Sequence, residues 1–268
     1  MILDIFLLNE TKYPEVFILK YDDFGKRIIE KVNEKFKGTN AEINVSLGSN
    51  EEIPRGDILL RSALITVISE DPELKKLNIW PISPLESEVL IQRSQLPKPT
   101  NFWGVYWECL GLTLYDISEK GKNPKEAKAL YEDINRNKQK MGLKDSDLEE
   151  RLLIVNSGLD IDQTFPRGVK PKVIPGVTQV YGHETLKRTG QYHRFNYGLE
   201  NGLPSVSQLG NGNRTLFMPS ENKDIGLRVL SRDGHFDLGA KDKYFDNIPE
   251  FSDGDDEDGR ITFIRRVT

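Results

Sequence analysis

The chain has 268 residues, of which 37% are hydrophobic and 29% are charged, and its formal net charge is −5. This length and composition predict a globular protein with one large or two small domains. The lack of a basic field disfavours nucleic-acid binding, because phosphate recognition needs clustered Lys and Arg side chains. A single cysteine, Cys109, excludes a disulfide within the chain.

Residues 1–8 are apolar apart from Asp4, lack a basic leader and are much shorter than a membrane-spanning helix. We therefore expect no signal peptide and no transmembrane segment. The cytoplasm, a virion, or a cell surface reached by a non-classical route remain alternative locations. Residues 5–8 and 16–20 predict a β-hairpin at the start of the chain.

The first predicted helix covers residues 24–36. Asp22 or Asp23 can cap its start, and Gly38 stands just past its end. Its apolar residues recur at intervals of three and four and are Phe24, Ile28, Ile29, Val32 and Phe36. A strand is expected at 41–47, followed by a long apolar run at 58–68.

Proline residues recur between 72 and 99 and separate short apolar pieces. We place a domain boundary at the end of this region. The expected organisation is a smaller α/β domain at 1–99, serving assembly or attachment, and a second domain at 100–268. The acidic and basic residues of 71–75 superficially match a metal-dependent nuclease core, but a charged helix gives the same spacing.

The second domain begins with an aromatic run at 101–107 and a strand at 110–115. A helix is predicted at 124–141, with Asn123 as its cap, Pro124 at its first position and Glu126 completing a capping box. A shorter helix from Ser146 and a strand at 152–155 follow. The predicted class is α+β, with the 124–141 helix packed on small antiparallel sheets.

Residues 156–218 have the composition of loops, with frequent Gly and Pro and apolar runs of three or four residues. We expect this region to act as the scaffold of a binding face. His183 and His193 flank a helical turn at 184–187. Two histidines at this separation, without a paired Cys or carboxylate, are a weak zinc signal, and we expect no metal there.

The last forty residues contain two short apolar runs, 227–230 and 261–264, that predict strands. Between them, Leu230, Phe236, Leu238 and Ala240 alternate with polar residues, which predicts a further strand with these four on its inner face. Residues 241–258 are polar and aromatic without a period. Such a segment cannot form a core, so we expect its side chains to be displayed.

These residues resemble a known family. The run Arg214-Thr215-Leu216, the GLR sequence at Gly226, the polar middle and the strand after Gly259 resemble the C-terminal portion of variable proteins diversified by retroelements, as in viruses, bacteria and archaea. The likeness covers about the last third of the chain. The family usually closes with Gly-Phe-Arg, whereas Arg260 and Ile261 follow Gly259 here.

The resemblance implies a C-type-lectin fold of the formylglycine-generating-enzyme-like kind, with a hypervariable segment at about 228–258. It further implies a non-enzymatic protein that recognises a receptor or other target. The residues expected to bind the ligand are Asp233, His235, Asp237, Lys241, Lys243, Tyr244, Asp246, Asn247, Asp253, Asp255 and Asp256.

The expected partner is a basic or polar protein or a glycan, because the predicted binding residues are mainly acidic. No catalytic residue, metal site or cofactor is expected. The acidic run 253–259 fails the helix-loop-helix calcium pattern, because a loop with its glycine at 259 would begin at Gly254 rather than at Asp. A lectin-like calcium site there is the alternative to a solvated acidic turn.

An enzyme of unknown reaction is the alternative function, for example a metal-dependent nuclease or an enzyme built on the lectin-like scaffold. The chain contains no phosphate-binding loop, no Gly-x-Ser-x-Gly elbow and no His-Glu-x-x-His motif. The sequence predicts neither the identity of the ligand nor the oligomeric state.

Overall fold

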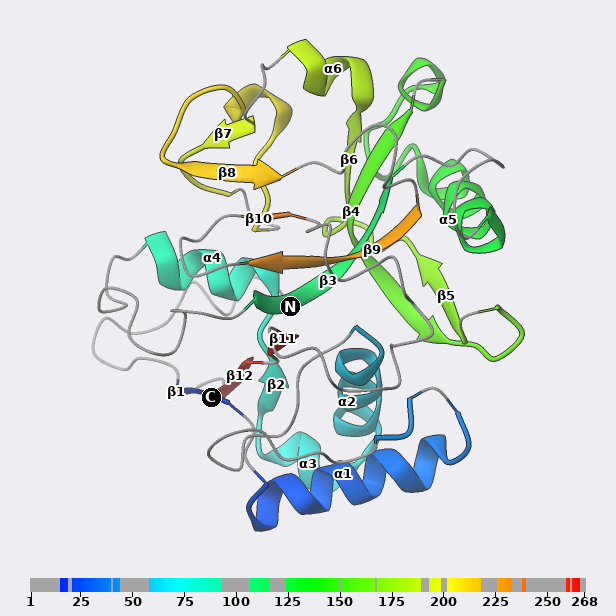
Figure 1. The fold of residues 1–268 in the computed structure, drawn as a ribbon, viewed down its shortest axis with the longest axis vertical. Coiled ribbons are helices and arrows are strands. Elements are labelled where there is room, and N and C mark those ends of the chain that lie inside the picture. The colour runs from blue at the N-terminus through cyan, green and yellow to red at the C-terminus, as the bar shows by residue number, and fades with distance from the viewer. Residues whose placement is uncertain are drawn as a thin grey trace.

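The structure, a computed structural model, shows a mixed fold of helices and small, mainly antiparallel sheets (Figure 1). The predicted α+β class is therefore confirmed. The residues that the structure describes are 15–18, 21–39, 41–43, 58–92, 107–115, 124–149, 151–166, 168–188, 193–198, 202–217, 226–232, 238–239, 259–260 and 262–265.

Six α-helices and two 3₁₀ helices lie within these residues. The α-helices are α1 (Asp23–Phe36), α2 (Ile58–Glu70), α3 (Pro72–Lys76), α4 (Pro84–Gln92), α5 (Pro124–Asn137) and α6 (His183–Arg188), and the 3₁₀ helices are η3 (Asp145–Leu148) and η4 (Val206–Gln208). In the described part of the chain no helix is long and apolar enough to cross a membrane.

The described strands form two sheets. One has three strands in the order β1 (Glu15–Ile18), β12 (Thr262–Arg265), β2 (Ile79–Pro81). The larger sheet has the order β5-β4-β3-β9-β10-β8-β7, with β6 paired to β4 and β11 paired to β3. Its strands are β3 (Trp107–Tyr115), β4 (Leu152–Ile161), β5 (Val169–Lys172), β6 (Gln179–Gly182), β7 (His193–Phe195), β8 (Arg214–Phe217), β9 (Gly226–Arg232), β10 (Leu238–Gly239) and β11 (Gly259–Arg260).

Helix α1 forms where its caps and apolar stripe predict it. The Asp22 side chain accepts a hydrogen bond from the Gly25 N–H at 2.9 Å, which satisfies one free donor of the first turn. Gly38 has φ 71° just past the end, a conformation that side chains with a Cβ rarely adopt. The stripe buries Ile28 and Val32 completely, so the helix is held by its packed face.

The N-terminal strand predictions are only partly tested. Strand β1 forms, and it pairs antiparallel with β12 at the other end of the chain. Residues 5–8, its predicted hairpin partner, lie outside the described residues. The apolar run 58–68 belongs to helix α2, which is buried on most of its circumference. Residues 41–43 are not in a strand, and 44–47 lie outside the described residues.

Helix α5 buries Ala127, Leu130 and Ile134 against the larger sheet and ends at Asn137, earlier than predicted. Asn123, its predicted cap, lies outside the described residues. Glu126 is 0% exposed, and neither carboxylate oxygen has a hydrogen-bond partner within the described part of the chain. The expected helix from Ser146 is the 3₁₀ turn η3, and the strand at 152–155 extends to Ile161.

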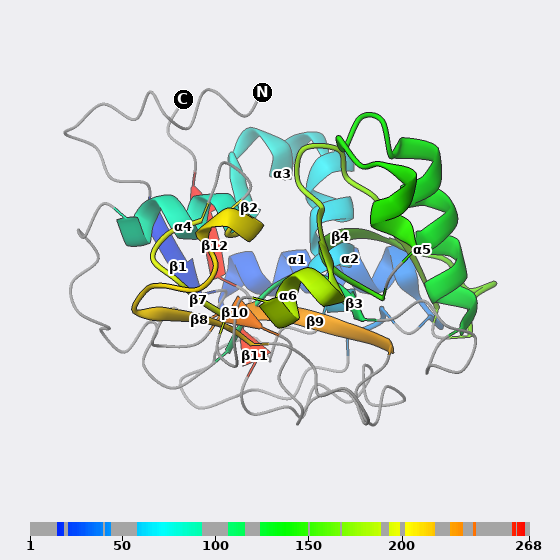
Figure 2. The same cartoon turned by 90° about the horizontal axis from the view of Figure 1, so that it is seen from above.

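Strand β4 is buried on both faces and separates two hydrophobic cores. Leu152 and Ile154 face the core under α5, while Leu153 and Val155 face a second core that contains Tyr181 and other residues of the β6–β8 region. The region 156–218 was expected to be loop-like, but its described residues include several strands and helix α6. Figure 2 shows α2, α4 and α5 on one side of strands β8 and β9.

Two predictions about the last forty residues are wrong in detail. Leu230 and Leu238 do not share one strand, because β9 and β10 are antiparallel and Leu238 pairs with Arg232. Five residues, 233–237, connect the two strands and lie outside the described residues. The final strand β12 was expected in the sheet of the second domain, but it pairs with β1 and β2 instead.

Candidate functional site

All of the predicted ligand-binding residues lie outside the described residues, so their prediction remains untested. They fall in two connections, 233–237 between β9 and β10, and 240–258 between β10 and β11. The structure does describe the strands from which both connections start and to which they return.

These strands meet on a single row of the larger sheet. In strand order from β7 to β11, the row consists of His193, Leu216, Leu238, Arg232, Glu108 and Arg260. The row lies at the C-terminal end of β9. Since neighbouring strands are about 4.8 Å apart, the three steps from β10 to β11 bring the two ends of the 240–258 connection within roughly 15 Å.

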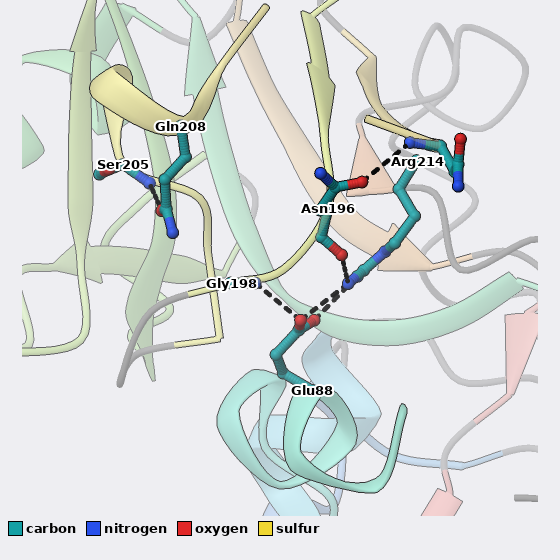
Figure 3. A network of polar contacts seen from close by, with 7 residues as sticks. Glu88, Asn196, Gly198, Ser205, Gln208 and Arg214 are labelled. Carbon is teal, nitrogen blue, oxygen red and sulfur yellow. Dashed lines mark hydrogen bonds and ion pairs between the residues drawn. The ribbon is translucent and has the colours of Figure 1, made fainter. Parts of the chain in front are cut away.

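A buried ion pair lies beside the same end of the sheet (Figure 3). Arg214, the first residue of β8, donates to both carboxylate oxygens of Glu88, with Nη1–Oε1 at 2.7 Å and Nη2–Oε2 at 2.8 Å. The Glu88 and Arg214 side chains are 1% and 8% exposed. This two-point geometry fixes the guanidinium plane relative to helix α4.

The hydrogen bonds at the start of α4 fix the turn that precedes Glu88. Ser83 Oγ accepts a hydrogen bond from the Glu86 N–H, and the Glu86 carboxylate accepts one from the Ser83 N–H at 2.8 Å. This capping box, with Pro84 at the first helical position, fixes the first turn and the direction of the helix. Glu88 then points into the interior from the next turn.

The ion pair also binds the backbone that follows β7. Glu88 Oε1 accepts a hydrogen bond from the Gly198 N–H at 2.7 Å, and Arg214 Nη1 donates to the Asn196 carbonyl at 3.3 Å. The guanidinium carbon lies 4.4 Å from the centre of the Phe195 ring, close enough for a cation–π contact. One buried charge pair therefore joins α4, β8 and the turn after β7.

This network was not predicted from the sequence. Glu88 and Arg214 are 126 residues apart, so no local pattern relates them. The available signal was chemical: in α4 the two glutamates lie beside the apolar run 89–91, and buried carboxylates are found almost only with partners.

Two other titratable groups lie near β7. His193 is half-buried in β7, and this burial lowers its pKa. Tyr181 is completely buried in β6, which raises the pKa of its hydroxyl, and that hydroxyl donates to the Pro204 carbonyl at 2.5 Å. Both side chains therefore remain uncharged near neutral pH. His183, the other histidine considered for zinc, is the first residue of α6.

The acidic stretch at 71–75 has a structural role. Asp71 caps helix α3 by accepting from the N–H groups of Glu73 and Leu74 at 2.9 and 3.0 Å, and it also accepts from Lys31. Among the described residues there is no group of three or more side chains that could hold a metal ion. The acidic run 253–259, where calcium was the alternative, lies outside the described residues except for Gly259.

Comparison of the chain with models of protein families, with curated proteins and with solved structures finds no match.

Proposed function

We propose that the chain is a non-enzymatic recognition protein that binds its ligand through residues 228–258, called here the display segment. In this proposal the larger sheet belongs to a C-type-lectin-like scaffold. The display segment is diversified genetically and carries the ligand-binding side chains, from Asp233 to Asp256. Binding of this kind requires no cofactor.

The observation that carries the proposal is the anchoring of the segment. Strands β9, β10 and β11 lie in one sheet and share the row that contains Leu238, Arg232 and Arg260. The chain leaves and re-enters this row at 233–237 and 240–258. Changes in those two stretches can alter a surface while the backbone pairs of the row stay in place, which is what a variable binding site requires.

The charge of the segment favours a basic or polar protein surface or a glycan. The eleven predicted binding residues include six Asp and two Lys. The net negative charge of these residues accelerates encounter with a basic partner and repels phosphate groups. Attraction of this kind should weaken between low and moderate salt, because the screening length is about 10 Å at 0.1 M.

The coding locus provides the first test. A neighbouring reverse transcriptase gene and a near-repeat of codons 226–266 that differs at adenines are expected. A locus that lacks both would contradict genetic diversification of the segment.

A library in which the eleven predicted binding residues are randomised tests the display role directly. Most library members are expected to stay folded, as judged by resistance to protease on a display platform. A matched library at eleven buried core positions should lose folding in most members. Equal losses of folding in the two libraries would show that the segment has a structural role. This result would contradict the proposal even if the coding locus contained both expected features.

A further inference from the structure

Residues 194–198, at and beyond the end of β7, and residues 210–214, which lead into β8, form two neighbouring segments that we call the asparagine platform. Arg194, Asn196, Tyr197, Asn211 and Asn213 are exposed on it. Tyr197 is 53% exposed, the largest value among the described large hydrophobic side chains. The platform lies outside the display segment, so the inference below does not depend on the proposed function.

The two loops of the platform hold each other in a fixed arrangement. The Gly210 N–H donates to the Arg194 carbonyl at 2.8 Å, and the Asn213 N–H donates to the Asn196 side-chain oxygen at 3.3 Å. Gly212 packs so closely that a Cβ there would lie 2.1 Å from the Phe195 carbonyl group, and its φ is +151°. No residue other than glycine fits this contact.

The buried Glu88–Arg214 pair supports the platform from beneath (Figure 3). Removing two charges from water costs several kcal/mol per ion, and their attraction recovers this only with good geometry. A buried ion pair is therefore weak evidence for a gain in stability. Its role is better explained by the positions of the groups that it holds in place. Here it fixes the Asn196 carbonyl and the Gly198 N–H, on either side of Tyr197.

The exposed side chains of this fixed surface are three asparagines, one tyrosine and one cation, Arg194, and the four uncharged ones suit one class of ligand. Each Asn side chain offers an amide donor and a carbonyl acceptor, which is the pairing that a sugar hydroxyl requires. A tyrosine ring offers an apolar face for the C–H groups of a sugar ring, at a low entropic cost because it has few rotatable bonds. The Arg214 guanidinium is already bound to Glu88, so Arg194 is the one exposed cation of the platform.

We propose that the asparagine platform is a binding site for a neutral saccharide. Tyr197 stacks on the sugar ring, and the Asn196, Asn211 and Asn213 side chains bind its hydroxyl groups. Because the loops are held in place before binding, little conformational entropy is lost when the sugar binds.

The test is a titration of the full-length ¹⁵N-labelled protein with the methyl glycosides of glucose, galactose, mannose and N-acetylglucosamine. At least one of them is expected to shift the side-chain amide signals of the platform asparagines, with a dissociation constant on the order of 1 mM. Tyr197→Ala should weaken binding about tenfold or more, whereas Tyr197→Phe should retain it, because the ring provides the stacking face.

Leu77→Ala serves as the matched control, because Leu77 is also a large exposed side chain, 42% exposed, but lies at the end of α3. It should leave the titration unchanged. If Tyr197→Ala fails to fold, Asn211→Ala carries the test with the same expected loss. The proposal is overturned if none of the four glycosides shifts the asparagine amides in large molar excess, or if the folded Tyr197→Ala protein binds as well as wild type.

Discussion

Glu126 is the least satisfied polar side chain in the described part of the chain. It is completely buried at the start of α5, and its carboxylate has no hydrogen-bond partner there. Burying a polar group without a partner costs about 1–3 kcal/mol in protein mutational data. Glu126→Met keeps a similar volume and removes this cost, so we expect a melting temperature several degrees higher.

The matched control for this prediction is Glu132→Met, because Glu132 is an exposed residue of the same helix. It should change the free energy of unfolding by no more than about 0.5 kcal/mol. A lower melting temperature for Glu126→Met would show that the buried carboxylate is paired with a group outside the described residues.

The Glu88–Arg214 pair is the opposite case, a buried charge with its partner in place. Arg214→Met would leave the Glu88 carboxylate buried beside a neutral side chain, and we expect a loss of about 3–5 kcal/mol in the free energy of unfolding. Lys172→Met breaks the exposed pair with Asp160 and should cost less than about 1 kcal/mol. Urea denaturation of the two variants measures both values, and similar small losses would argue against a positioning role for the buried pair.

Asp71 should make stability sensitive to acid. The hydrogen bond from Lys31, followed by that from the Leu74 N–H, lowers the pKa of Asp71 from 3.8 to about 2. Since the folded state binds the proton more weakly than the unfolded state, the stabilisation is fully present above about pH 4 and is lost as the pH falls towards 2. The melting-temperature difference between wild type and Asp71→Asn should therefore shrink over this interval. A difference that is constant from pH 5 to pH 2 would contradict this assignment.

Substitutions in the β9–β10 hairpin test whether stability and recognition depend on different residues. Leu238 lies in the paired row of the sheet, and Asp237 precedes it in the 233–237 connection. Leu238→Ala, like Phe236→Ala, should cost about 2–5 kcal/mol if the predicted inward face is correct. Changes at Asp237 or His235 should stay near 0.5 kcal/mol. Melting curves of the four variants compare the two faces, and large losses in both pairs would count against a displayed segment.

The elements that the sequence predicted well are those defined by local signals. Helices α1 and α5 each combine apolar residues at helical spacing with recognisable start signals, so their existence follows from a few neighbouring residues. Strand pairing is different. Nothing local relates β1 to β12 or β3 to β11, because backbone hydrogen bonds between distant strands carry no sequence code of their own.

The same distinction applies to the site. The polar stretch 241–258 is visible in the sequence, whereas the buried network needs α4 and β8 to be brought together in space. The alternation through 230–240 misled because its residues belong to two antiparallel strands, β9 and β10, rather than to one strand.

Strand β12, near the end of the chain, pairs with strands from its beginning. It pairs with β1 on one side and β2 on the other, both from the first hundred residues. Within β12, Phe263 is packed in the core of α1 and α2, and Ile264 is packed in the core of β4 and β8. The last strand therefore contacts both of the regions that a boundary at residue 99 would separate.

This arrangement predicts that the described regions unfold together. Phe263 is 0% exposed, so Phe263→Ala should cost about 3–5 kcal/mol, and it should weaken α1 and β4 equally although the residue contacts mainly the α1–α2 core. Hydrogen exchange of the α1 and β4 amides in increasing denaturant measures both regions in one experiment. Ile65→Ala, at a side chain of α2 that is 38% exposed, is the control and should change the protection of neither region by much.

Loss of protection in α1 at a clearly lower denaturant concentration than in β4 would show that residues 1–99 unfold as a separate domain. Coincident loss would mean that β12 couples the two cores into one cooperative unit, since its adjacent side chains cannot leave one core without leaving the other.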